Sequence, residues 1–165
     1  MKWVLRLGLG LAVFVGLVTG VGWMLPVSHE ASRSADVAKT PAEVYSLVSD
    51  VRNYAAWWPD ISRVEMLVDE PGRTTFREHM SDGPIVMSVV SLTPPTQFVT
   101  KIDDPDQPFG GTWTFDISET PTGARITVTE RGEIYNPIFR AMARLVFGYT
   151  GTMESFLGAA QQRLR

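Results

Sequence analysis

Between residues 63 and 135 the sequence repeats one pattern six times: a short run of alternating apolar and polar residues, followed by turn residues. Turn pairs such as Pro71-Gly72 and Asp82-Gly83 separate the runs, and pairs of this kind join antiparallel strands in hairpins. A sheet with one apolar face must be covered by another apolar element. The rest of the chain therefore has to supply a cover for the sheet. The six runs are residues 63–69, 74–80, 85–92, 98–103, 112–118 and 124–135.

The C-terminal segment, residues 136–165, has the pattern of an amphipathic helix. Asn136 and Pro137 predict its start, and Gly148 and Gly151 predict a kink or a break, because a glycine inside a helix costs about 1 kcal/mol relative to alanine. We expect the sheet to wrap around this long helix. Its apolar positions recur at steps of three and four: Ile138, Met142, Leu145, Tyr149, Met153, Phe156, Ala160 and Leu164.

A strand and two short helices are predicted ahead of the six runs. Residues 29–38 alternate small and polar side chains, as a strand with one solvated face does. Thr40 and Glu43 have the spacing of a capping box, which predicts a helix directly after Thr40. A second short helix over residues 50–57 must end before Pro59, because the residue preceding a proline avoids the helical conformation. The predicted fold class is α+β, with an antiparallel sheet of about seven strands.

The N-terminus carries an uncharged apolar run over residues 7–25. A helix of that length spans about 29 Å, close to the roughly 30 Å hydrocarbon core of a bilayer. Lys2 and Arg6 precede the run, and basic residues stay on the cytoplasmic side. We predict that residues 1–26 are a single-pass transmembrane anchor, contacting the membrane through residues 7–25, and that residues 27–165 form one extracytoplasmic domain.

A cleaved secretory signal is the alternative for the N-terminal segment, because Gly20 and Gly22 are small enough for a signal peptidase site. The apolar run is longer than the core of a typical signal peptide, and no A-x-A site follows it, so we favour the anchor. Both an anchor and a cleaved signal would carry residues 27–165 out of the cytoplasm.

Charge and residue inventory exclude several functional classes. The 15 Lys and Arg include Lys2 and Arg6, so the remaining domain has 13 basic residues against 18 acidic ones, which argues against nucleic-acid binding. The sequence has no cysteine and two histidines, and we expect neither a metal site nor a cofactor. The domain is predicted to be a monomer.

The order of these elements, together with four stretches, resembles the START-like or SRPBCC superfamily, and within it the polyketide cyclase/dehydrase-type branch. The stretches are "SDVRNYAAWWPDISRVEML", "GGTWTFDIS", "GARITVTERGEI" and "NPIFRAMARLVF…MESFLGAAQQRL", and the resemblance covers about residues 30–165. It implies a helix-grip (Bet v 1-like) fold, whose sheet curls around the C-terminal helix and leaves a deep apolar cavity. Members bind lipids, sterols, aromatic polyketides or plant hormones, and a minority catalyse cyclisation, dehydration or hydroxylation. A membrane anchor departs from most members.

The resemblance places the adjacent pair Trp57 and Trp58 at the end of the second short helix. Neighbouring helical residues point about 100° apart, so one indole is expected to pack inward and the other to face the cavity mouth or solvent. The pair acts either as a plug of the core or as a lid on a ligand. We predict that the cavity opens near this pair. The predicted ligand-binding residues are Trp57, Trp58, Met87, Trp113, Phe139 and Met142.

Strand alternation places two glutamates on the apolar face of the sheet. Glu78 shares a face with Phe76, and Glu130 shares one with Val128. A buried carboxylate is costly unless it is paired, and an unpaired one titrates towards neutral pH. Glu78 and Glu130 are therefore candidates for general acid/base catalysis or for binding a polar group of a ligand. The alternative is a structural ion pair with Arg52, Arg140 or Arg144, or a strand end that is already hydrated; His79 is predicted to point outward into solvent.

The leading functional hypothesis is a membrane-tethered, extracytoplasmic binding module for an apolar small molecule such as a lipid, an isoprenoid or a polyketide-like compound. One alternative is a cyclase/dehydratase-type enzyme that uses Glu78 or Glu130 as acid or base. The other is an adaptor domain whose cavity has collapsed. The cavity volume separates the adaptor from the rest, and a deep glutamate without an arginine partner favours the enzyme.

Overall fold

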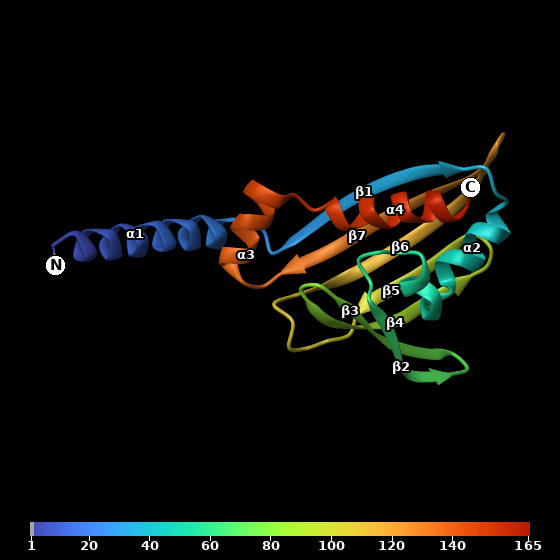
Figure 1. The fold of residues 1–165 in the computed structure, drawn as a ribbon, viewed down its shortest axis with the longest axis horizontal. Helices are drawn as coiled ribbons and strands as arrows, with labels where there is room; N and C mark the ends of the chain where they lie inside the picture. The colour runs from blue at the N-terminus through green and yellow to red at the C-terminus, as the bar shows by residue number, and fades with distance from the viewer. Residues whose placement is uncertain (1) are drawn as a thin grey trace.

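Seven antiparallel strands form one sheet that curves around the C-terminal end of the chain (Figure 1). The computed structural model describes residues 2–165, and the strand order is β1-β7-β6-β5-β4-β3-β2. All strands from β2 to β7 pair with their neighbours in sequence, and β1 joins the sheet beside β7, as hairpin turns between the runs predict. The strands are β1 (Ser28–Val37), β2 (Arg63–Glu70), β3 (Arg73–Met80), β4 (Gly83–Thr93), β5 (Gln97–Ile102), β6 (Phe109–Thr120) and β7 (Gly123–Ile134).

Two short helices follow β1, and they begin and end as the sequence predicts. In α2 (Pro41–Ser49) the Thr40 hydroxyl accepts the Glu43 N–H at 3.3 Å, and the Glu43 carboxylate accepts the Thr40 N–H at 2.9 Å. This confirms the capping box. The second helix, η1 (Val51–Ala56), is a 3₁₀ helix that ends before Trp57.

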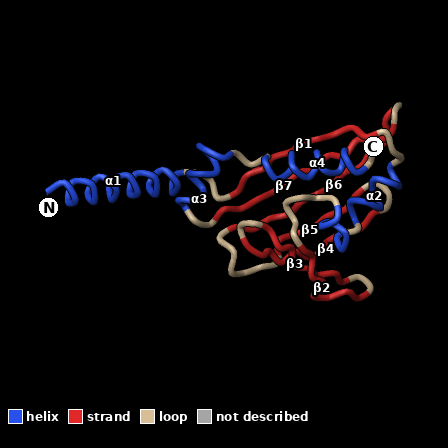
Figure 2. Tube along the Cα trace, viewed as in Figure 1, coloured by secondary structure: helices blue, strands red, loops and turns tan. Residues whose placement is uncertain are grey.

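The C-terminal segment is divided into three pieces instead of one long helix (Figure 2). They are α3 (Pro137–Met142), the π-helical turn η2 (Ala143–Phe147) and α4 (Gly151–Arg163). The break falls at Gly148, whose φ of +75° is open to glycine, so the predicted break is confirmed. The prediction of one continuous apolar face is wrong, because Ile138 and Leu145 are 41% and 67% exposed. The apolar residues ahead of the break are largely exposed, and only α4, which follows it, packs its apolar residues against the sheet.

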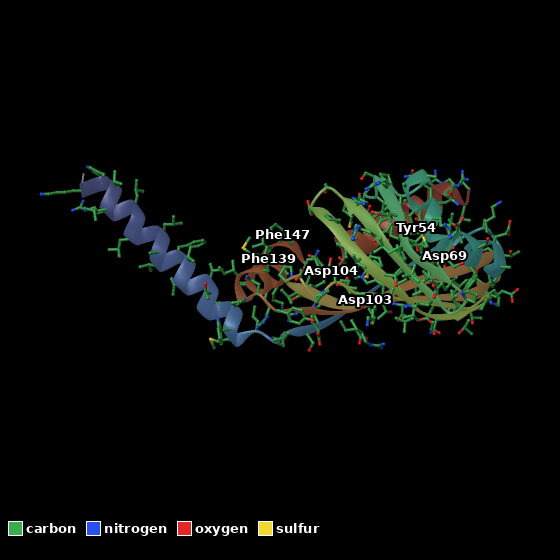
Figure 3. All side chains as sticks on the ribbon, turned by 90° about the horizontal axis from the view of Figure 1, so that it is seen from below. Tyr54, Asp69, Asp103, Asp104, Phe139 and Phe147 are labelled. Atoms are coloured by element: carbon green, nitrogen blue, oxygen red, sulfur yellow. The ribbon has the colours of Figure 1, made fainter. Side chains whose placement is uncertain are left out.

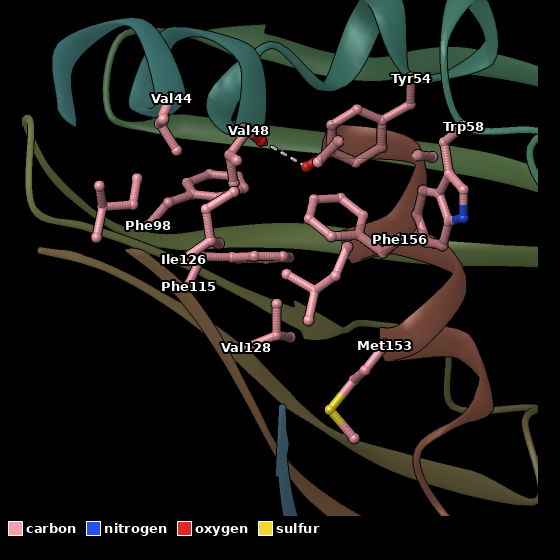
Figure 4. Close-up of a cluster of buried hydrophobic side chains, with 14 of the residues drawn as sticks. Val44, Val48, Tyr54, Trp58, Phe98, Phe115, Ile126, Val128, Met153 and Phe156 are labelled. Atoms are coloured by element: carbon pink, nitrogen blue, oxygen red, sulfur yellow. Dashed lines mark hydrogen bonds between the residues drawn. The ribbon is translucent and has the colours of Figure 1, made fainter. Parts of the chain in front are cut away.

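The hydrophobic core fills the space between the concave face of the sheet and α2, η1 and α4 (Figure 4). Phe156 of α4 is fully buried at its centre, and its ring lies 5.1 Å from the rings of both Phe115 and Trp58. The Tyr54 hydroxyl donates to the Val48 carbonyl at 2.6 Å, so this buried phenol is satisfied. The aromatic cluster fills one end of the space under the sheet. Other elements surround the other end.

The N-terminal helix α1 (Lys2–Met24) projects away from the sheet and contacts the rest of the chain only near its C-terminal end (Figure 1). Arg140 of α3 is buried there and donates to the carbonyls of Gly22 at 3.0 Å and Leu25 at 3.1 Å. It also donates to the Ile134 and Tyr135 carbonyls. Among residues 2–165, α1 is the one helix long and apolar enough to cross a membrane, with a mean hydropathy of 2.1 over its best window.

Candidate functional site

A cavity of about 790 Å³ lies under the sheet, between its concave face and the segment from α3 to α4. Strands β3 to β7 contribute its walls, and the start of α4 closes one side. Ligand pockets of about 300–1,000 Å³ hold small molecules of ordinary size. The space under the sheet has therefore not collapsed, which counts against the adaptor alternative.

The mouth of the cavity lies at the end of the sheet beside α1. It is lined by the β3–β4 turn at Asp82, by the β5–β6 loop from Asp104 to Phe109, and by Phe139 and Phe147. Figure 3 shows Asp104, Phe139 and Phe147 at the end of the domain next to α1, with Tyr54 farther away. Phe139 and Phe147 are 58% and 72% exposed, so they form an open apolar rim.

The predicted opening near the tryptophan pair is wrong, because that end of the cavity is closed. Trp58 is buried, lines the cavity, and donates from Nε1 to the Ser155 hydroxyl at 3.3 Å. Trp57 is half-buried and packs edge-on against Tyr54 and Phe156, with ring centroids at 5.4 and 5.2 Å. Both indoles contact Tyr54 and Phe156, Trp58 forms part of the inner wall, and neither indole lies at the mouth.

Four of the six predicted ligand-binding residues line this cavity, and Trp57 and Met142 do not. Met87 and Trp113 stand on β4 and β6, whose alternation turns them to the concave face. Met142 lies at the end of α3, between the lining residues Phe139 and Ala143, but its own side chain is not part of the lining. A role in ligand binding stays a prediction for all six. The four lining residues are Trp58, Met87, Trp113 and Phe139.

Glu78 lies inside the cavity without a partner. Its side chain stands on β3 next to the wall residues Phe76 and Met80, as strand alternation predicts, and it is only 7% exposed. Across residues 2–165, no ion pair or side-chain hydrogen bond reaches its carboxyl group. Burial raises the pKa of Glu78 to about 7. The group is therefore able to gain or lose a proton near neutral pH.

The predicted arginine partners are engaged elsewhere, so the ion-pair alternative is wrong for Glu78. Arg52 pairs with Asp69 on β2, and Arg140 donates to backbone carbonyls beside α1. Arg144 is exposed on η2 and does not line the cavity. The reason is the direction of the side chains: Phe139 and Ala143 line the cavity, whereas Arg140 faces the end of α1 and Arg144 faces solvent.

Glu130 pairs with a histidine, which the sequence analysis did not anticipate. The His29 Nε2 atom lies 3.3 Å from the Glu130 carboxylate, and the His29 ring stacks on Tyr149 at 3.9 Å. Burial raises the pKa of Glu130, and the neighbouring His29 opposes that rise. The signal was present in β1, where His29 has the same strand parity as Ala31 and Ala35 on the inward face.

The other histidine, His79, is half-buried and lies 3.5 Å from the Glu65 carboxylate. It does not line the cavity. The described residues, 2–165, contain no cluster of three or more His, Asp or Glu side chains arranged to hold a metal ion.

Comparisons with known proteins find a family and a fold. The sequence profile of the family described as polyketide cyclase / dehydrase and lipid transport matches residues 28–165. None of the curated proteins matches the sequence. Among solved structures, a START superfamily protein from Mycobacterium smegmatis is similar with a TM-score of 0.66 and 22% identity, over 82% of this chain and 97% of that one.

Two aromatase/cyclase structures are also similar. The di-domain ARO/CYC StfQ from the steffimycin biosynthetic pathway has a TM-score of 0.69 at 16% identity over 84% of this chain, which spans about half (51%) of StfQ. The Zhui aromatase/cyclase from Streptomyces sp. R1128 has a TM-score of 0.64 at 12% identity, over 83% of this chain and 93% of that one. At these identities the likeness establishes the fold, and it confirms the helix-grip prediction.

Proposed function

The chain belongs to the polyketide cyclase/dehydrase and lipid transport family, and on this premise we propose that it is a membrane-tethered module that binds an apolar small molecule under its sheet. The observation that carries the proposal is the open cavity of about 790 Å³, whose mouth lies beside the apolar helix α1. Its inner wall is formed by apolar side chains such as Phe76, Met87 and Phe115. A lipid, an isoprenoid or a polyketide-like compound has the size and polarity to fill such a space.

Two observations support a membrane anchor, and the second also supports its retention in the mature protein. The α1 helix has the length and hydropathy of a membrane span, and its exposed surface is apolar. The buried guanidinium of Arg140 uses the carbonyls of Gly22 and Leu25 at the end of this helix. Removal of α1 would leave part of that guanidinium without partners, which is costly for a buried charge. Lys2 and Arg6 support a cytoplasmic N-terminus, and with it an extracytoplasmic domain.

The position of the mouth supports loading from the bilayer. The α3–η2 segment, which packs against the base of α1, exposes Phe139, Leu145, Val146 and Phe147. Exposed apolar patches of this kind mark contacts with membranes or partners. With α1 in the bilayer, this rim lies at the headgroup level. An apolar ligand then passes from the membrane into the cavity with little exposure to water.

Binding can be tested on the full-length chain in lipid nanodiscs with an apolar fluorophore that fits the cavity. Ala143 lines the cavity, whereas Leu145 lies two residues farther along η2, is exposed and does not line it. Ala143→Trp should weaken binding because the indole occupies the space of the ligand, and Leu145→Trp should leave it unchanged. Equal binding by both variants would move the site out of this cavity.

Glu78 supports a second candidate, an acid/base enzyme of the cyclase/dehydratase type. A carboxyl group whose pKa lies near the working pH is suited to move protons, and Glu78 has no structural partner among the described residues. Mass spectrometry of the ligand before and after incubation with the protein separates the candidates. Loss of turnover with retained binding in Glu78→Gln would favour the enzyme, and no change in ligand mass with the wild-type protein would favour the binding module.

A further inference from the structure

The charged side chains that line the cavity are almost all acidic. Within the described chain, six carboxylates line it and no lysine or arginine does. The single basic side chain in the lining, His29, is already paired with Glu130. The carboxylates are Glu78, Asp82, Asp104, Asp106, Glu130 and Glu133.

Glu78 is the deepest of these groups, and among the described residues it is the buried one without a partner. Its carboxyl group is surrounded by apolar walls that include Phe76 and Met87, where an uncompensated charge is poorly solvated. A negatively charged ligand group placed there would be repelled, whereas a positively charged one would supply the missing partner. The interior is therefore complementary to a cation.

The mouth of the cavity is also lined by negatively charged side chains. Asp104 is fixed in the β5–β6 loop, where its carboxylate accepts the Asp106 N–H at 3.2 Å, and Asp82 stands opposite on the exposed β3–β4 turn. Lys101, the nearest lysine in sequence, pairs with Asp103 and does not line this cavity. A mouth lined by one sign of charge raises the local concentration of ligands of the opposite sign.

We propose that the cavity binds cationic amphiphiles, in which an ammonium group pairs with Glu78 and an apolar tail or ring system lies along the sheet, and that it excludes carboxylate and phosphate amphiphiles. This inference rests on the proposed binding function and names its ligand class. The neutral walls by themselves would accept any apolar molecule. The carboxylates select the cationic ones among them.

The test uses three probes with one tail and different head groups: terminally brominated dodecylamine, dodecanol and dodecanesulfonate. Bromine quenches nearby tryptophan emission. The protein is the full-length chain in zwitterionic nanodiscs whose scaffold protein lacks tryptophan, with Trp3→Phe and Trp23→Phe, so that emission comes only from Trp57, Trp58 and Trp113. Probe dissolved in the bilayer around α1 then leaves the signal unchanged.

We expect the amine to bind on the order of tenfold or more tightly than the sulfonate, with the alcohol between them. Glu78→Gln should reduce the amine-to-sulfonate ratio, and Glu119→Gln, at an exposed position on β6, should leave it unchanged. Because each ratio is compared with wild type in the same nanodiscs, partitioning of the probes into lipid cancels. The double variant Asp104→Asn, Asp106→Asn provides a second test at the mouth and should also lower the ratio.

Three results would overturn the inference, and they differ in whether they also reject the proposed binding function. Equal binding of all three probes, or preference for the sulfonate, would reject the cationic ligand class and leave the binding function intact. An unchanged ratio in both the Glu78 and the mouth variants would show that the carboxylates do not select the ligand. Absence of quenching by every probe would reject the binding function together with the inference.

Discussion

At the scale of single residues, Glu78 is a buried carboxyl group without a partner among the described residues. A carboxyl group that is buried without a partner stabilises the folded protein when it is protonated and destabilises it when it is ionised. Its retention in the wall of a cavity is explained if a ligand supplies the partner. Phe76 and Met87 beside it show that an apolar residue fits this environment.

The titration of Glu78 predicts a stability that falls with rising pH. The folded-state pKa of about 7 lies above the ordinary value of 4.5, so the folded state holds its proton more tightly than the unfolded state does. The contribution is complete below pH 4.5 and is lost as the pH rises to about 7, a change of about 3 kcal/mol in the free energy of unfolding. Denaturant unfolding of the full-length protein at several pH values measures this change.

Glu78→Gln should remove this decrease, because glutamine does not titrate, and the variant should gain stability over the wild type as the pH rises. The other groups, including the Glu130–His29 pair, titrate in both proteins and cancel in the difference. Glu119→Gln should follow the wild-type curve. Parallel curves for wild type and Glu78→Gln would contradict the raised pKa.

At the scale of secondary-structure elements, the break between η2 and α4 decides what the C-terminal segment covers. Residues of α4 such as Met153 and Phe156 are fully buried against the sheet, whereas the apolar residues of η2 are exposed beside the cavity mouth. One continuous helix would place both sets on one face. The break therefore separates an element that closes the core from an element that forms the rim.

Gly148 makes this break possible, and we predict that Gly148→Ala destabilises the protein by about 1–3 kcal/mol. Its φ of +75° with ψ of −174° is a conformation that residues with a Cβ adopt only under strain. Gly151→Ala is the matched control, because Gly151 begins α4 with a helical backbone and open space around it, and it should be neutral or slightly stabilising. Thermal unfolding of the two variants measures the difference, and equal effects would contradict the role given to the backbone of Gly148.

At the scale of the whole molecule, α1 contacts the rest of the chain only near its C-terminal end, at α3. The buried core consists of residues from Val37 to Leu164 and includes none from α1. The helix reaches the domain at α3, next to the mouth of the cavity. With α1 in a bilayer, as proposed, this contact would keep the mouth of the cavity close to the membrane.

This arrangement predicts the topology of the chain in cells. The sequence contains no cysteine, so single cysteines report their location without background. Ser118→Cys, exposed on β6, should react with a membrane-impermeant maleimide in spheroplasts of a bacterial expression host. A cysteine inserted after Met1 should react only after the membrane is permeabilised. The reverse labelling pattern would contradict the orientation, and release of a shortened chain would show that the N-terminal segment is a cleaved signal.

The sequence by itself determined the features that depend on neighbours a few residues apart. The capping box at Thr40, the strands between the turn pairs, the inward face of Glu78 and the break near Gly148 all follow from local hydrogen bonding, strand alternation or backbone freedom. The family resemblance then supplied the helix-grip architecture, because the order of these elements is shared even where identity is low.

Only the tertiary structure decided which distant residues meet. The pairing of His29 with Glu130, across 101 positions of sequence, depends on the register of β1 against β7. The open end of the cavity depends on where the α3–η2 segment lies ahead of the break, with Phe139 and Phe147 at the mouth and Trp58 at the closed end. The isolation of Glu78 depends on where the arginines lie, since Arg140 donates to carbonyls beside α1 and Arg144 is exposed. Alternation assigns a side chain to a face of the sheet, but the curvature of the sheet and the packing of distant elements determine which partners reach it.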